Sequence, residues 1–200
     1  MTVPFLDLGG GYRELKAEID AAVLRVLDSG WYIGGSEIDT FEANFAQYCN
    51  ADYAVGVANG LDALILALRA LDIGPGDEVI VPSNTYIATW LAVSAVGAVI
   101  VPVEPDLTTH NIDPERVACA ITSRTKVLLP VHLYGQPADL DPLLALAKQH
   151  NLFVIEDGAQ AHGARYKGQR LGGHGDVVCW RFYPGKNLGA MGDGGAITTK

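Results

Sequence analysis

The first quarter of the chain has the apolar spacing of helices. Apolar positions recur every three or four residues over 12–27 and over 36–49, so the sequence predicts two amphipathic helices in these ranges. An uncharged loop lies between them and reads Ser29-Gly30-Trp31-Tyr32-Ile33-Gly34-Gly35. Such an aromatic loop is either a packing plug or a contact for another molecule.

From residue 53 onward, short apolar runs alternate with helical patterns. Strands are predicted at 53–58, 78–81, 99–103, 126–131 and 152–156, with helices at 61–71, 86–96, 114–120 and 140–150 between them. After residue 157 glycine becomes dense, and two further short strands are predicted near 176–182 and 195–199.

Three of these strands are continuously apolar: Val79-Ile80-Val81, Val127-Leu128-Leu129 and Phe153-Val154-Ile155. Continuous runs indicate strands that are covered on both faces, as in a parallel sheet with helices on each side. The predicted fold class is therefore α/β, with three α-β-α layers and a mostly parallel sheet.

Composition narrows the class of protein. The chain has 200 residues, of which 49% are hydrophobic and 18% charged, so it can bury a large core and is not disordered. Its net charge of -9 argues against a nucleic-acid partner, because binding phosphates requires clustered Lys and Arg. Three scattered cysteines suggest no disulfide framework, and no signal-peptide pattern opens the chain, so we expect a cytoplasmic protein.

One uncharged stretch, residues 79–103, is long enough to be considered as a membrane span. Pro82 and Gly97 interrupt it, and acidic residues rather than Lys or Arg flank it. A buried strand, helix and strand explain it better, and no membrane partner is expected.

Ligands of an open parallel sheet bind at the carboxyl ends of its strands. There the sequence places a glycine turn at Asn59-Gly60, which opens a helix and suits a phosphate, although a glycine at such a turn is more often structural. Tyr86 follows the next strand and either stacks on a flat ligand or packs in the core. Asp157 ends a buried strand, where it either faces a cation or caps a helix.

Lys186 lies among glycines and apolar residues. A poorly solvated lysine has a lowered pKa and can act as a neutral amine that forms a Schiff base. A solvated surface lysine is the simpler alternative. Metal binding is not expected, because His162 and His174 lack the spacing of a metal motif.

Five ordered motifs together resemble the DegT/DnrJ/StrS-type sugar aminotransferases, which are pyridoxal phosphate (PLP) enzymes of fold type I. They are residues 59–64 (NGLDAL), 74–82 (GPGDEVIVP), 130–135 (PVHLYG), 156–163 (EDGAQAHG) and 182–189 (FYPGKNLG). Residues 30–33 (GWYI) look like the subgroup that aminates C3 of a dTDP-3-keto-6-deoxyhexose. The resemblance implies a mostly parallel mixed sheet, a nucleotide-sugar substrate, an amino-acid donor such as glutamate, and a homodimer with shared active sites.

The resemblance also implies roles for single residues. Lys186 is the catalytic lysine that holds PLP as a Schiff base and carries the proton, and Asp157 pairs with the pyridine nitrogen. The other implied cofactor contacts are Gly60 and Leu61 at the phosphate, Tyr86 on the ring face, and Gln160 at the phenolic oxygen or the ring. Candidate substrate residues are Tyr32, His132 and Tyr183, with a buried structural histidine as the alternative for His132.

Two features depart from the family pattern. Arg181 stands where the family has a serine that contacts the PLP phosphate, and a guanidinium there either strengthens that contact or overfills the pocket. Relatives are nearly twice as long, so we expect residues 1–200 to hold the N-terminal helices and the PLP-binding large domain, without the smaller C-terminal domain.

Alternative functions follow from these departures. One is a truncated or non-catalytic relative that binds PLP or a nucleotide sugar without turnover. A PLP sugar dehydratase is disfavoured, because dehydratases of this family have histidine in place of the lysine at 186. A nicotinamide dehydrogenase is disfavoured too, because no G-x-G-x-x-G follows the first strand.

Overall fold

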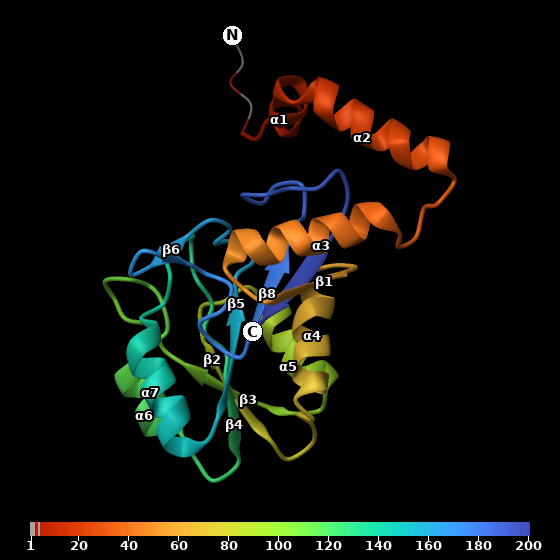
Figure 1. Ribbon diagram of the computed structural model, residues 1–200. Helices are drawn as coiled ribbons and strands as arrows, with labels where there is room; N and C mark the ends of the chain where they lie inside the picture. The colour runs from red at the N-terminus through yellow and green to blue at the C-terminus, as the bar shows by residue number, and fades with distance from the viewer. Residues whose placement is uncertain (1–2, 4) are drawn as a thin grey trace.

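The computed structural model describes residue 3 and residues 5–200, and within them the central element is a seven-stranded sheet (Figure 1). The order across the sheet is β1-β9-β8-β5-β4-β2-β3. Strand β9 is antiparallel to both of its neighbours, whereas the other four neighbouring pairs are parallel. In chain order, the strands of this sheet are β1 (Tyr53–Val57), β2 (Glu78–Pro82), β3 (Val99–Val103), β4 (Thr125–Leu128), β5 (Phe153–Asp157), β8 (Val177–Arg181) and β9 (Gly195–Thr199).

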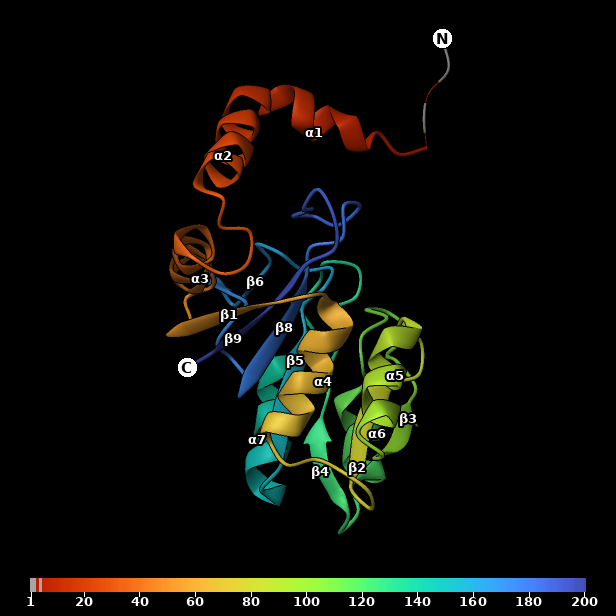
Figure 2. The same ribbon diagram turned by 90° about the vertical axis from the view of Figure 1, so that its right-hand side faces the viewer.

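Helices cover both faces of the sheet, which confirms the predicted three layers (Figure 2). On one face lie α4 (Gly60–Ala70) and α5 (Ile87–Ala95), and on the other lie α6 (Pro114–Ala120) and α7 (Leu140–His150). The stretch 79–103, considered above as a membrane span, is the succession β2, α5 and β3. Among the described residues, no helix has both the length and the apolar character needed to cross a membrane.

In the continuous apolar runs, alternate side chains pack against the two helix layers, one set on each face of the sheet. In β2, Val79 and Val81 pack in the cluster that contains α4 and α5, whereas Ile80 between them packs in the cluster that contains α6 and α7. Successive side chains of a strand point to opposite faces. A strand between two helical layers therefore tends to carry apolar side chains in succession, as Val79, Ile80 and Val81 do.

A third cluster lies beneath α3 (Ser36–Cys49) and fixes the end of β8. Phe45 of α3 contacts Trp180 and Phe182 edge-on, with ring centroids 5.5 Å and 5.3 Å apart. All three rings are buried. Aromatic pairs in this geometry add to the stability that burial already provides. The segment that carries Arg181 and leads to Lys186 thus starts from a rigid anchor.

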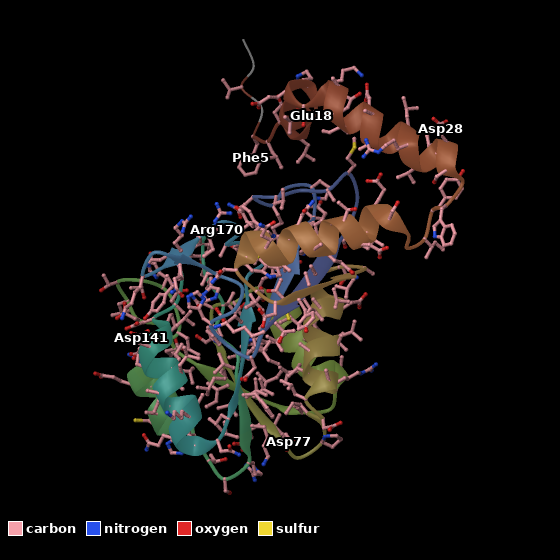
Figure 3. The ribbon with its side chains drawn as sticks, in the orientation of Figure 1. Phe5, Glu18, Asp28, Asp77, Asp141 and Arg170 are labelled. Carbon is pink, nitrogen blue, oxygen red and sulfur yellow. The ribbon has the colours of Figure 1, made fainter. Side chains whose placement is uncertain are left out.

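The N-terminal arm, residues 5–35, departs from the prediction. In place of one helix over 12–27 there are two, α1 (Leu8–Glu14) and α2 (Lys16–Ser29), which break at Leu15. Neither helix buries any residue, so the apolar face of the predicted amphipathic helix is exposed. Asp77, just before β2, marks the amino-terminal edge of the sheet, and Glu18 and Asp28 of the arm lie beyond the opposite edge (Figure 3).

Most other predicted elements agree with the structure to within two residues at each end. An exception is the strand predicted at 126–131: β4 ends at Leu128, and Val131 forms an isolated bridge to Asp157. Pro130 has no N–H to continue the ladder. The hairpin of β6 (Arg165–Tyr166) and β7 (Gln169–Arg170) was not predicted.

Candidate active site at the carboxyl ends of the strands

A narrow pocket lies where the carboxyl ends of β2, β5 and β8 meet the first turn of α4. Its walls include all seven residues expected to contact the cofactor: Gly60, Leu61, Tyr86, Asp157, Gln160, Arg181 and Lys186. Lys186 and Asp157, which belong to different segments, therefore share one pocket. The free volume inside is about 30 Å³, room for one or two water molecules, and the pocket shares Gln160 and Lys186 with a wider hollow beside it.

One wall of the pocket is the N-terminus of α4. The first N–H groups of a helix have no acceptor within the helix. The Asn59 side chain accepts the N–H of Asp62 at 2.9 Å, and its amide donates back to the Asp62 carboxylate at 2.9 Å. The N–H groups of Gly60 and Leu61 remain at the pocket wall, where the helix dipole favours an anion.

Tyr86 lies immediately before α5 in an extended conformation. Its side chain is 64% exposed, so core packing, the alternative role predicted for Tyr86, is wrong. An exposed ring that borders a pocket can lie against a flat ligand without losing core contacts.

Asp157 is the last residue of β5 and is only 7% exposed. Its Oδ2 accepts a hydrogen bond from the Thr89 hydroxyl at 3.0 Å, and its Oδ1 accepts the N–H of Ala159 at 3.1 Å in a turn. No helix follows it among the described residues, so helix capping, the alternative role, is wrong. Burial raises the pKa of the Asp157 carboxyl, while those two hydrogen bonds and the nearby Lys186 act in the opposite direction.

Lys186 lies in the turn after β8, where its backbone N–H donates to the Tyr183 carbonyl at 2.8 Å. Its side chain is partly buried and borders both this pocket and a shallower hollow beside it, which Tyr134, Gln160 and Asn187 also line. Burial lowers the pKa of the Lys186 ammonium; the Asp157 carboxylate opposes that effect and Arg181 adds to it. Because its side chain is partly buried against this pocket, Lys186 is not a fully solvated surface lysine.

Arg181 ends β8 and lies across the N-terminus of α4. A Cβ atom on Gly60 would come within 2.7 Å of the Arg181 Cβ, so only glycine fits beneath this side chain. The Arg181 Nε is buried and has no hydrogen-bond partner among the described residues, and its distance to the nearest Asp193 oxygen is 3.7 Å. A buried donor without a partner is costly and marks a place for an acceptor.

The three residues expected to contact substrate do not line this pocket. His132 is wrong as a pocket residue, because its ring is fully buried and both nitrogens are used. Nδ1 accepts the N–H of Ala138 at 3.0 Å, so the proton lies on Nε2, which donates to Glu156 at 2.8 Å. His132 is the buried structural histidine that was its alternative.

Tyr183 and Tyr32 lie outside the pocket for other reasons. Tyr183 lies beside Arg181, whose guanidinium carbon is 4.9 Å from the ring centroid of Tyr183. Tyr32 belongs to a separate apolar groove, which Phe41, Phe182 and Leu188 also line. The structure thus leaves Tyr32 on the surface, away from the lysine of its own chain.

The pocket contains residues that sequence reasoning missed. Thr89 contacts Asp157, and Thr85 contacts Thr89 at 2.8 Å. Thr85 and Thr89 are four residues apart at the start of a predicted helix, and this spacing could have indicated that both side chains lie on the same side of that helix. Cys179 lies opposite Asp157 in the pairing of β5 and β8, and burial raises the pKa of its thiol well above the usual value. In the part of the chain that the structure describes, no group of His, Cys, Asp and Glu could hold a metal ion.

Comparison with known proteins identifies relatives of this chain. The family model described as "DegT/DnrJ/EryC1/StrS aminotransferase family" matches residues 13–200. The chain is 64% identical over 197 residues to the dTDP-3-amino-3,4,6-trideoxy-alpha-D-glucose transaminase of Streptomyces venezuelae, covering 98% of this chain and 52% of the relative. It thus spans about half the length of that curated relative.

Solved structures agree with the fold. The X-ray structure of S. venezuelae DesV in complex with a ketimine intermediate superposes with a TM-score of 0.96 at 64% identity, covering 98% of this chain and 53% of that one. NtdA from Bacillus subtilis with bound cofactor PMP superposes with a TM-score of 0.89 at 36% identity, covering 99% and 45%.

The electrostatics of the pocket predict opposite effects of two substitutions on the Lys186 amine. In the free protein we expect a pKa below the ordinary 10.5 for Lys186, so that its neutral form appears at lower pH. Asp157→Asn removes a negative charge that favours the ammonium and lowers this pKa further. Arg181→Ser removes a positive charge and raises it. Competitive acetylation across a pH series, read by peptide mass spectrometry, measures both, with the exposed Lys148 as internal reference. Shifts of the same sign in the two variants would contradict this account.

Proposed function

The chain belongs to the DegT/DnrJ/EryC1/StrS aminotransferase family, and from that premise we propose that it is a cytoplasmic PLP-dependent aminotransferase that acts on a dTDP-linked deoxysugar. The amino group comes from glutamate and goes to a keto group of the sugar, at C3 by analogy with the relative named above. The observation that carries this proposal is the convergence of Lys186, Asp157 and the α4 N-terminus on one pocket.

The residues present fit PLP in their chemistry. At one end of the pocket, two N–H groups and the unpartnered Arg181 Nε offer donors to a phosphate. At the other end, the buried Asp157 carboxylate suits a protonated nitrogen, and an amine of lowered pKa lies on the same pocket. NtdA, a relative of the same fold, binds PMP, the aminated form of this cofactor.

Each residue then has a distinct task. When bound, PLP supplies an aldehyde that condenses with amines and a cationic ring that withdraws electrons from the carbon attached to the nitrogen. Lys186 Nζ provides the resident amine and afterwards accepts and returns a proton. Asp157 would hold the ring nitrogen in its protonated form through charge and hydrogen bonding, and the exposed ring of Tyr86 would lie against the cofactor ring. Gln160 would contact the phenolic oxygen or the ring.

The phosphate end differs from the family pattern, and we propose that Arg181 binds the phosphate. The guanidinium is charged at all relevant pH values and can donate two parallel hydrogen bonds to phosphate oxygens. Its stem lies across Gly60, so the phosphate would receive the helix N–H groups from one side and the guanidinium from the other.

We further propose that the working form is a homodimer with shared active sites. The arm exposes the apolar side chains Leu24 and Leu27 of α2 together with Trp31 and Tyr32 of the loop. It lies on the side of the carboxyl ends, where the Leu6 Cδ2 is 3.6 Å from a Cβ position on Gly185, next to the lysine. A second copy seated on this apolar surface would bring its own loop to the substrate side of the pocket.

The first test is covalent binding of PLP. Incubation with PLP should produce a visible absorption band, and borohydride reduction should fix the cofactor to the peptide that contains Lys186. Lys186→Ala should abolish both signals, whereas Lys148→Ala on the outer side of α7 should retain them. Absorbance spectra and peptide mass spectrometry give the readout.

Turnover separates the enzyme from a binding protein. With glutamate and a dTDP-3-keto-6-deoxyhexose, the protein should form the aminated sugar, and Lys186→Ala should not. A band without turnover would instead support the non-catalytic relative, for which the narrow pocket beneath Arg181 is the motivating observation. Absence of the band in the parent protein would refute both the enzyme and a relative that binds PLP, and would leave only a relative that binds a nucleotide sugar.

The second test concerns Arg181. Arg181→Met keeps an unbranched stem above Gly60 but removes the charge, so we expect PLP to bind about tenfold more weakly or worse, the loss of one charge-assisted hydrogen bond. Pyridoxal, which has no phosphate, should bind equally to the parent and the variant. Spectral titration measures both dissociation constants. Equal weakening of the two ligands, or tighter binding of PLP to the variant, would argue that Arg181 only fills space.

The third test concerns the dimer. Leu24→Glu combined with Leu27→Glu places charges on the apolar face of α2, and the sedimentation mass should fall from that of two chains to that of one. Leu66→Glu, which adds a charge to an exposed apolar position on α4, should leave the mass unchanged. A parent protein that sediments as a single chain would overturn the proposed assembly.

A further inference from the structure

Two threonine hydroxyls stand in line behind the pocket carboxylate. The Thr85 and Thr89 hydroxyl oxygens are 2.8 Å apart, and the Thr89 hydroxyl is 3.0 Å from the Asp157 Oδ2. Thr89 is 1% exposed, so no solvent competes for its hydroxyl, whereas Thr85 is only partly buried. A chain of hydroxyls thus leads from the border of the pocket to the buried carboxylate.

The chemistry of the groups gives this chain a direction. An ionised carboxylate has no proton, so Thr89 donates to Asp157. A hydroxyl has one proton, and Thr89 has then used it, so Thr85 donates to Thr89. The other carboxylate oxygen accepts the Ala159 N–H. Among the described residues, Thr89 is therefore the one side chain that donates a hydrogen bond to Asp157.

The local fold explains why these hydroxyls meet. Thr85 precedes α5 and Thr89 lies in its first turn, where its backbone N–H donates to the Tyr86 carbonyl at 3.1 Å. Residues four apart lie on the same side of a helix, and a β-branched side chain in a helix has few rotamers. A threonine hydroxyl in a helix often bonds to the carbonyl four residues earlier. Here the hydroxyls of Thr89 and Thr85 bond to each other, and Thr89 reaches across to β5.

We propose that Thr89, supported by Thr85, is a positioning residue that keeps the Asp157 carboxylate ionised and oriented toward the heterocycle nitrogen. This inference rests on the proposed function for its purpose, but its physical content concerns the protein alone. Without the hydroxyl, one oxygen of a buried carboxylate would lose its hydrogen bond, and the neutral acid would become favoured.

Other groups also act on Asp157. The titratable groups on the segments around Asp157 are His132, Lys186 and Arg181. Glu156 precedes it on β5, and Cys179 lies opposite it on β8. Burial raises the pKa of Asp157, while the Ala159 and Thr89 hydrogen bonds and the charge of Lys186 oppose that rise. Of these opposing effects, the Thr89 hydroxyl can be removed with almost no change of shape, because valine and threonine have nearly the same outline.

The decisive experiment uses the full chain without cofactor. Carbon-13 NMR of protein labelled at the aspartate carboxyl carbons follows each titration, and the signal lost in Asp157→Asn identifies Asp157. Thr89→Val should raise the midpoint of Asp157 by about one pH unit, the effect of one hydrogen bond to a charged group. An unchanged midpoint in Thr89→Val would overturn the proposal.

Two companion variants separate the hydroxyl from packing. Thr89→Ser retains a hydroxyl and loses a methyl group, so the midpoint should return to the parent value. Thr85→Val leaves the Thr89 hydroxyl in place without its own donor, so a smaller rise is expected. If Thr89→Ser shifts the midpoint as far as Thr89→Val does, packing is responsible and the proposal fails. Should Thr89→Val not fold, as judged by circular dichroism, the Thr85→Val titration decides in the same way.

With PLP bound, the same variants provide a second readout. Thr89→Val should move the pH midpoint of the visible band and lower kcat about tenfold with little change in the KM for glutamate, whereas Thr89→Ser should restore both. Because the NMR titration requires no cofactor, a failure to bind PLP would refute the proposed function alone. An unchanged titration midpoint of Asp157 in Thr89→Val would refute only the positioning role of Thr89.

Discussion

A carboxylate buried at the end of a central strand is the constraint on which the rest of the site depends. Asp157 is almost removed from water, and an ionised group in that position is stable only with hydrogen bonds and a nearby positive charge. The structure supplies a backbone N–H from the turn after β5, a hydroxyl from α5 and an amine on the loop after β8. Three separate segments therefore have to converge on one oxygen pair, and this convergence defines the pocket.

The pocket is electrically polarised along its length. At one end, the α4 N-terminus and Arg181 present donors and positive charge, while Asp157 presents negative charge at the other. A ligand with an anionic tail and a protonated ring nitrogen matches that polarity in one orientation only. Lys186 lines the same pocket, where burial favours the neutral form of its amine and the Asp157 carboxylate limits that effect. Orientation and reactivity are thus set by the same few charges.

The sheet could be predicted from the sequence because three of its strands carry continuous apolar runs, which are typical of a parallel sheet between two helical layers. The motif residues could be expected in one pocket because the carboxyl ends of parallel strands lie at the same end of the sheet.

The arm was not predicted correctly, because an amphipathic pattern specifies a helix but not the partner that covers its face, and α2 has none among the described residues. His132 was misplaced because a sequence does not reveal which of two ring nitrogens meets a carboxylate and which a backbone N–H. Thr89 was missed because its role depends on a contact 68 positions away.

The neighbouring carboxyl groups Glu156 and Asp157 show how the strand itself separates structure from chemistry. Successive side chains point to opposite faces, so Asp157 reaches the pocket while Glu156 turns into the other layer. There Glu156 accepts hydrogen bonds from His132 at 2.8 Å and from the Gly175 N–H at 2.6 Å. These bonds tie the loop after β4 and the loop before β8 to β5 from behind. Because the second carboxyl group fixes the strand ends, the first can be held at the pocket with its geometry set before any ligand arrives, and a motif that begins with two acidic residues needs both for different reasons.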